Sequence, residues 1–203
     1  MPKHIKMDKR LQEFKRLLDI MDQLRKECPW DKKQTNESLR YLTIEETYEL
    51  ADAILEKDSD GIMQELGDLM LHLVFYAKIG SETNSFDIKD VLYHINEKLI
   101  RRHPHIFSDT VVKDEEDIKV NWDKIKMKEG RTSVLEGVPS SLPAMVKAYR
   151  IQEKVKGVGF EWEHIDQVWD KVKEEMGEFE KEISSGISKD RAEQEFGDVL
   201  FAL

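Results

Sequence analysis

Residues 42–49 read LTIEETYE, and residues 65–68 read ELGD. On a helix of about 3.6 residues per turn, the last acid of each stretch lies roughly one turn after the acids that precede it and shares a face with them. These acids are Glu45, Glu46, Glu49, Glu65 and Asp68. If the two helices pack antiparallel, the carboxylates converge. The two stretches therefore predict a helical protein with clustered carboxylates on adjacent helices.

The same acidic pattern occurs a second time. Glu174, Glu175 and Glu178 follow their counterparts by 129 positions, and Glu195 and Asp198 follow theirs by 130. A repeat at a nearly fixed offset indicates a duplicated helical unit. In the first copy the apolar run after the acids continues into a further helix, which the second copy lacks. We therefore expect a partial second copy whose missing surface belongs to a longer chain or to a partner.

Composition narrows the class of protein. The 203 residues are enough for one ordinary domain or two small ones, and 10 Gly and 5 Pro are too few for an all-β chain. A net charge of −10 argues against direct binding to nucleic acid or to an anionic membrane. The single Cys28, a charged start without a signal-peptide core, and a longest apolar stretch confined to residues 69–77 favour a cytoplasmic protein.

Apolar periodicity predicts an all-α fold. Helices are expected over residues 8–27, 38–56 and 61–78, the last closed by Gly80, and a fourth from residue 88 to the HPH sequence at 103–105. These four helices predict one bundle with short connections. Further helices are expected over residues 114–128, 143–156, 166–184 and 189–203. We divide the chain into a first repeat (1–107), a helical linker (108–142) and a partial second repeat (143–203).

Converging carboxylates require an explanation. Two of them about 4 Å apart repel by roughly 4 kcal/mol at an effective dielectric of about 20. Mg²⁺, with Mn²⁺ as the alternative, would offset this repulsion and hold phosphate oxygens on its other side. The competing interpretation is a solvated helix face, because a chain with 42 acidic residues produces Glu-x-x-Glu by chance. Recurrence of the whole pattern among apolar residues favours the metal site.

Several motifs together resemble the MazG nucleoside triphosphate pyrophosphohydrolases in their two-repeat form, with the second repeat truncated. They are CPWDK at 28–32 with Gln34 and Thr35, LTIEETYE at 42–49, ELGD at 65–68, Lys98 with RRHPH at 101–105, SLPA at 141–144 and VGFEW at 158–162. The resemblance covers essentially the whole chain. It implies an all-α fold, dimerisation, Mg²⁺ dependence and hydrolysis of nucleoside triphosphates to monophosphate and pyrophosphate.

The resemblance also implies roles for individual residues. Its metal ligands would be Glu46, Glu49, Glu65 and Asp68 in the first copy and Glu175, Glu178, Glu195 and Asp198 in the second. Glu45 and Glu174 lie beside them as candidate catalytic bases. Candidate substrate-binding residues are Lys98, Arg101, Arg102 and Trp30, with Lys171 and Arg191 in the second copy. The helix bearing the Lys–Arg pair that grips the triphosphate has no second-copy counterpart, although in relatives with two repeats the second can be the active one.

Some of these residues have simpler readings. Lys98 and Arg102 also provide favourable charge at a helix C-terminus. Trp30, expected in a loop, could stack on a nucleobase or anchor the loop. His72 lies on the acidic stripe, but Mg²⁺ prefers oxygen ligands, and Ala202 at the matched position favours a histidine that supports the ligands or belongs to the core.

Two hypotheses for function follow. The first is a Mg²⁺-dependent nucleoside triphosphate pyrophosphohydrolase of nucleotide-pool house-cleaning, in which Glu45 or Glu174 deprotonates the attacking water. The second is a catalytically weak or silent nucleotide-sensing or regulatory helical dimerisation module, favoured by the missing Lys–Arg helix. Both predict a homodimer.

Overall fold

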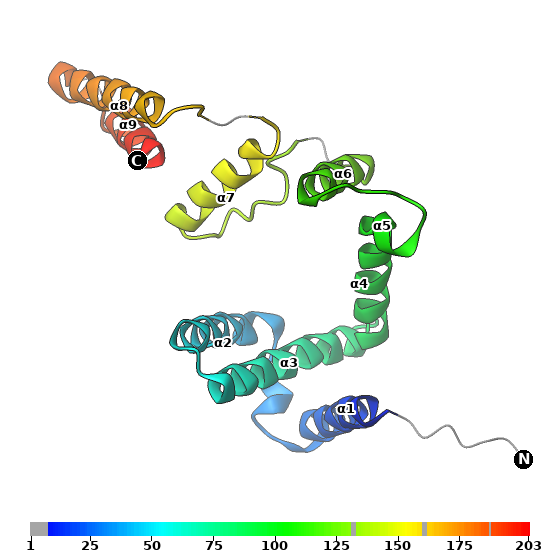
Figure 1. Ribbon diagram of the computed structural model, residues 1–203. Helices are drawn as coiled ribbons and strands as arrows, with labels where there is room; N and C mark the ends of the chain where they lie inside the picture. The colour runs from blue at the N-terminus through cyan, green and yellow to red at the C-terminus, as the bar shows by residue number, and fades with distance from the viewer. Residues whose placement is uncertain (1–7, 131–132, 160–161, 187) are drawn as a thin grey trace, which may run out of the picture. The chain divides into compact units, whose positions relative to one another are not determined.

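The computed structural model describes residues 8–130, 133–159, 162–186 and 188–203 (Figure 1). Within them all regular secondary structure is helical, so the predicted all-α class is confirmed. None of the described helices is long and apolar enough to cross a membrane. The first seven residues of the charged N-terminal segment, and Phe160 and Glu161 of the VGFEW motif, lie outside the described residues. The chain divides into two compact units, Met1–Arg101 and Arg102–Leu203.

The first unit contains α1 (Lys9–Glu27), the 3₁₀ turn η1 (Asp31–Lys33), α2 (Asn36–Glu56), α3 (Ser59–Glu82) and α4 (Ile88–Arg102). Short polar side chains cap these helices as their sequences predict. The carboxylate of Asp8 accepts from the Arg10 amide at 2.9 Å at the start of α1. Thr35 and Ser38 form a reciprocal capping box at the start of α2.

Gly80 does not end α3, which was the prediction, because the helix continues to Glu82. Gly80 is buried, and a Cβ atom there would lie 2.8 Å from the ring of Phe86. The absence of a side chain at Gly80 therefore allows Phe86, after the end of α3, to pack closely against the helix. The interpretation of this glycine as a helix-ending residue missed that role.

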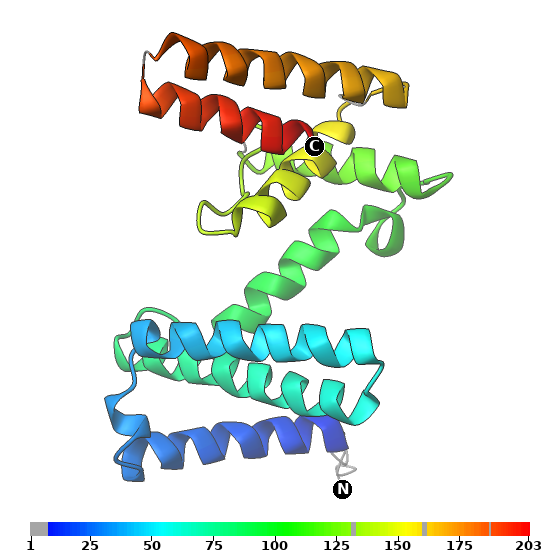
Figure 2. The ribbon, with the colours of Figure 1, turned by 90° about the vertical axis from the view of Figure 1, so that its left-hand side faces the viewer.

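The core of the first unit lies where α3 packs between α1 and α2 (Figure 2). Its buried side chains are Met21, Leu39, Val74 and Phe75. Each contributes roughly 1.5–3 kcal/mol by leaving water. The antiparallel packing of α2 on α3 brings the acidic stretches of these two helices together.

The fourth helix leaves this three-helix layer instead of completing a bundle with it (Figure 2). Its apolar side chains Val91, Leu92, Ile95 and Leu99 are 39–46% exposed. The amphipathic pattern of α4 therefore predicted the helix, but its apolar face is not covered by the described part of this unit.

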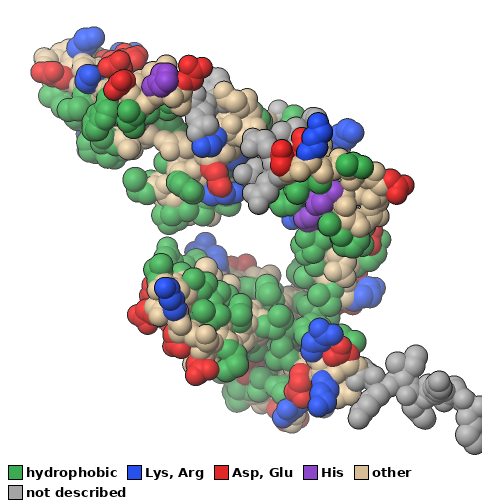
Figure 3. Space-filling view, viewed as in Figure 1, with side chains coloured by type: hydrophobic (Ala, Val, Ile, Leu, Met, Phe, Trp, Pro, Cys, Tyr) green, Lys and Arg blue, Asp and Glu red, His purple; other side chains and the backbone are tan. Residues whose placement is uncertain are grey.

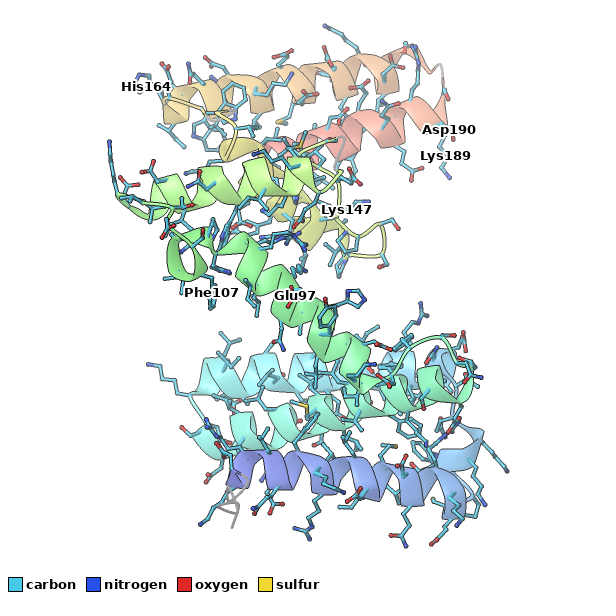
Figure 4. The ribbon with its side chains drawn as sticks, turned by 90° about the vertical axis from the view of Figure 1, so that its right-hand side faces the viewer. Glu97, Phe107, Lys147, His164, Lys189 and Asp190 are labelled. Atoms are coloured by element: carbon cyan, nitrogen blue, oxygen red, sulfur yellow. The ribbon has the colours of Figure 1, made fainter. Side chains whose placement is uncertain are left out.

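The second unit contains α5 (Pro104–Phe107), α6 (Glu115–Lys128), α7 (Ala144–Lys156), α8 (Ile165–Ser185) and α9 (Lys189–Ala202). Helices α8 and α9 pack as an antiparallel hairpin, in which His164 marks the start of α8 and Lys189 and Asp190 mark the start of α9 at the opposite end (Figure 4). Val172 and Val199 are buried in this unit.

The hairpins α2–α3 and α8–α9 match position by position. Helix α8 begins 129 positions after α2 and ends 129 positions after it, and α9 begins 130 positions after α3. The first residue after each leading helix, Lys57 in one hairpin and Gly186 in the other, has left-handed backbone with φ of 58° and 64°. The one-residue difference in offset therefore arises between Gly186 and Lys189.

The two hairpins differ at one point where their helices meet. A Cβ atom on Gly61 would lie 3.3 Å from the Cβ of Ala53, so two small residues meet there in α2–α3. The matched positions of α8–α9 hold Glu182 and Arg191, whose side chains approach to 3.7 Å. An ion pair therefore spans the contact that two small residues fill in the first hairpin.

Candidate metal centres

The first acidic group consists of Glu46, Glu49 and Glu65. One carboxylate oxygen from each lies within 4.8 Å of the others, with Glu46 and Glu65 half-buried and Glu49 exposed. The pKa of Glu46 is raised by burial, by the negative charges of Asp68 and Glu49, and by a hydrogen bond to Glu65. Within the described residues, no lysine or arginine pairs with these three carboxylates. The group is therefore an uncompensated concentration of negative charge.

Two other acids of the first copy lie beside this group. Asp68 is exposed, and its charge reaches Glu46, but its oxygens are not among the converging three. Glu45 is exposed and is also outside the group. The structure thus brings together three of the four predicted ligands.

The second acidic group consists of Glu175, Glu195 and Asp198, which also have oxygens within 4.8 Å of one another. Glu175 is buried, Glu195 is half-buried and Asp198 is exposed. The pKa of Glu195 is raised by burial and then by Glu178, Asp198, Glu175 and Glu182 in turn. Glu178 is therefore close enough to act on the group, although its oxygens are not among the converging three.

A cation accompanies the second group. The ammonium of Lys171 lies 2.7 Å from Glu175 and 3.0 Å from Glu174. Hydrogen bonds to Glu175 and Glu174 raise the pKa of Lys171. The matched residue of the first copy is Leu42, which packs on the core. Sequence reasoning named Lys171 for substrate binding and overlooked this pair, although its i, i+4 spacing indicates it.

Glu182 is a further acid that sequence reasoning missed. Its Oε2 is buried and has no hydrogen-bond partner among the described residues, while Oε1 lies 3.7 Å from Arg191. It follows Glu178 by four residues on α8, and this spacing could have found it. Arg191, a predicted substrate-binding residue, thus has an acid for a neighbour.

The predicted substrate-binding residues of the first copy occupy different surroundings. Lys98 lines an open groove of about 580 Å³ along α4, together with Phe86, Val91 and His94 among others. In the part of the chain that the structure describes, Lys98 makes no ion pair with the first acidic group. Arg101 is exposed at the end of α4.

Arg102 and Trp30 have well-defined environments. The Nε of Arg102 donates to Glu129 at 3.2 Å, and both side chains are only 20% exposed. Trp30 is 54% exposed just before η1, so it is not the buried loop anchor that tryptophan often becomes.

His72 has the character of a core residue. It is 7% exposed, its Nδ1 has no hydrogen-bond partner among the described residues, and burial lowers its pKa against the opposing charge of Asp68. The lowered pKa favours a neutral imidazole, which is consistent with the interpretation of His72 as a core residue.

The donor set of both acidic groups fits a hard divalent cation. All converging atoms are carboxylate oxygens, which Mg²⁺ and Mn²⁺ prefer, and two helices present them from fixed backbone positions. Raised pKa values in clustered acids mark functional sites more often than ordinary surfaces. A two-helix carboxylate site for a divalent cation is thus the class of site that the geometry defines.

Comparison with known proteins agrees with this class. The profile of the MazG nucleotide pyrophosphohydrolase domain matches residues 34–107, which contain the first acidic group. The chain is 40% identical over 200 residues to the nucleoside triphosphate pyrophosphohydrolase of Escherichia coli, covering 95% of this chain and 76% of that protein. It is 44% identical over 195 residues to a Thermotoga maritima protein named nucleoside triphosphate pyrophosphohydrolase/pyrophosphatase MazG, covering 94% and 73%.

A crystal structure of a MazG-related protein from Thermotoga maritima is also similar. The TM-score is 0.50 and the identity 26%, over 56% of this chain and 98% of that one. The chain belongs to the MazG family of nucleoside triphosphate pyrophosphohydrolases, and the resemblance found in its motifs is confirmed.

Proposed function

We propose that this protein uses a divalent cation to hydrolyse nucleoside triphosphates to nucleoside monophosphate and pyrophosphate. Its role would be nucleotide-pool house-cleaning, that is, the removal of unwanted nucleoside triphosphates. The observation that carries the proposal is the first acidic group, in which carboxylates within 4.8 Å of one another lack any cationic partner among the described residues. The repulsion between such close carboxylates destabilises the folded protein unless a bound cation offsets it. Membership of the MazG family identifies the class of substrate.

Glu46, Glu49 and Glu65, with Asp68 beside them, would hold Mg²⁺, or Mn²⁺ as the alternative. In the second copy Glu175, Glu178, Glu195 and Asp198 would do so. When bound, the cation supplies charge neutralisation to the triphosphate and acidity to a coordinated water. Glu46 is half-buried and Glu175 is buried, so these two carboxylates are the ligands of each site that are most sheltered from solvent.

The remaining chemistry falls to nearby side chains. Glu45 or Glu174 accepts the proton of the attacking water, whose oxygen bonds to a phosphorus of the α–β linkage while the bridging P–O bond breaks. Lys98, Arg101 and Arg102, or Lys171 and Arg191 in the second copy, neutralise the phosphates. The exposed ring of Trp30 can stack on the base.

A second candidate function is a catalytically weak or silent nucleotide-sensing or regulatory dimerisation module. Two observations favour it: Lys171 is paired with Glu175, and Arg102 is paired with Glu129. Both cations are thus engaged by carboxylates of their own chain.

We also propose the organisation expected from the sequence: a first repeat at 1–107, a helical linker at 108–142 and a partial second repeat at 143–203. The matching helix bounds of α2–α3 and α8–α9 support a duplication. Hydrophobic side chains gather over α2 and α3 in the view of Figure 3, and together with the exposed face of α4 they support a homodimer. The net charge of −10 argues against direct contact with nucleic acid or an anionic membrane, and the single Cys28 is consistent with a cytoplasmic protein.

The test is product analysis of the purified chain with ATP, dGTP and dUTP in the presence of Mg²⁺. We expect pyrophosphate and the monophosphate; orthophosphate, or no turnover, would contradict the enzymatic proposal. Comparing Glu49→Gln with Glu178→Gln identifies the active copy, and Glu56→Gln and Glu180→Gln, exposed acids on the same two helices, serve as controls. Calorimetric binding of Mg²⁺–nucleotide without turnover would favour the sensing module.

A further inference from the structure

The second acidic group differs from the first in having a built-in positive charge. The Lys171 ammonium lies 2.7 Å from the carboxylate of Glu175, which is a member of the group and only 7% exposed. The side chain of Lys171 is 37% exposed, so the pair is sheltered on one side and reaches solvent on the other. A lysine in this position neutralises part of the charge that would attract a divalent cation.

The first copy provides an internal comparison. Its matched residue is Leu42, which is half-buried and packs on the core formed around Leu39. A leucine there leaves the first group without compensation from the preceding turn of α2. The two groups thus share two matched positions, Glu46 with Glu175 and Glu65 with Glu195, but they differ in their third acid and in local charge.

We propose that Lys171 is the resident counter-cation of the second acidic group, and that Glu175 can ligate a divalent cation only after Lys171 releases it. This inference rests on the proposed metal-binding function of both groups. Metal alone therefore binds the second group more weakly than the first. Once released, Lys171 lies one helical turn from the ligands and can pair with a phosphate, so metal and triphosphate bind the second group together.

The competing explanation is an ordinary i, i+4 ion pair that only stabilises α8. The two explanations differ in what removal of the charge does. Without Lys171, a counter-cation role predicts tighter binding of metal alone, whereas a helix-stabilising role predicts no change in metal affinity. The exposed Lys173, which lies 3.1 Å from Asp170 on the same helix, is a matched control.

The experiment is a titration of the full chain with Mn²⁺. Binding is measured by calorimetry and by the electron paramagnetic resonance signal of free Mn²⁺. A Glu49→Gln background weakens the first group, so the signal reports the second. In this background we expect Lys171→Met to tighten binding of metal alone about fivefold, the effect of removing an ion pair of this exposure. Lys173→Met should leave the affinity unchanged.

A second readout uses a non-hydrolysable triphosphate analogue. It should raise Mn²⁺ affinity strongly when Lys171 is present and less in Lys171→Met. If circular dichroism shows that Lys171→Met has lost helix, Lys171→Gln removes the same charge and answers the same question. Unchanged or weaker binding of metal alone in the folded variant would overturn the inference while leaving the proposed function intact. Absence of metal binding in every variant, including the unsubstituted chain, would overturn both.

Discussion

Replacing Glu46 by glutamine should stabilise the metal-free protein and remove much of the stability that Mg²⁺ adds. Glu46 is half-buried among carboxylates whose oxygens lie within 4.8 Å, and the side chain of glutamine keeps its shape without its charge. Because the pKa of Glu46 is raised in the folded protein, its ionised form opposes folding. Without metal, the stability of the unsubstituted protein should therefore fall as pH rises through that pKa.

The size of the effect follows from the geometry. Two unit charges 4.8 Å apart repel by about 3.5 kcal/mol at an effective dielectric of about 20. Exposure of Glu49 and screening by salt reduce this to about 1 kcal/mol. For a chain of this length, that corresponds to a rise in Tm of about 2–4 °C.

The assay is thermal unfolding followed by circular dichroism, in EDTA and in Mg²⁺. Glu46→Gln should melt higher than the unsubstituted protein in EDTA and gain less from Mg²⁺, since a ligand stabilises only the form that binds it. Glu45→Gln, an exposed neighbour outside the group, is the matched control and should behave like the unsubstituted protein. A lower Tm for Glu46→Gln in EDTA would show that the group is not under electrostatic repulsion and would refute the reasoning.

Three further outcomes are expected. Leu39→Ala removes a side chain that is 0% exposed and should lower the free energy of unfolding by about 2–5 kcal/mol in guanidinium chloride, whereas Leu55→Ala, at 80% exposure, should change it little. Lys57→Gly should raise the free energy of unfolding by about 1 kcal/mol and Gly186→Ala should lower it by a similar amount, because both positions have left-handed backbone. A hydrogen bond from Arg25 lowers the pKa of Glu82, so the ionised Glu82 stabilises the fold above its ordinary pKa of 4.5, and this contribution is lost as the pH falls below 4.5. The free energy of unfolding of Glu82→Gln, measured in urea at pH values on both sides of 4.5, should therefore depend less on pH than that of the unsubstituted protein.

The helices themselves could be predicted closely, because apolar periodicity and capping residues are local signals. Asp8 and Asp58 mark the starts of α1 and α3, and the offset between the acidic patterns anticipated the matching bounds of the two hairpins. The prediction at Gly80 was wrong because its physical role is a contact with Phe86, six residues further along and outside the helix.

The placement of α4 and the composition of the acidic groups depend on packing that the sequence does not specify. An amphipathic pattern predicts that one face of the helix packs against another apolar surface, but it does not identify that surface. In the same way, helical spacing predicted five acids on each hairpin without showing which three would converge. It did not distinguish Asp68, outside the first group, from its counterpart Asp198, inside the second.

The close approach of Ala53 and Gly61 limits how the two hairpins can exchange sequence. Transferring Arg191 alone onto Gly61 would bring its side chain against both Asp58 and Ala53. Transferring Glu182 alone onto Ala53 would place a carboxylate opposite Gly61, without the arginine that lies near it in α8–α9. Each helix therefore fits the partner with which it diverged. An exchange of sequence between the two hairpins should therefore move both helices together and not one helix alone.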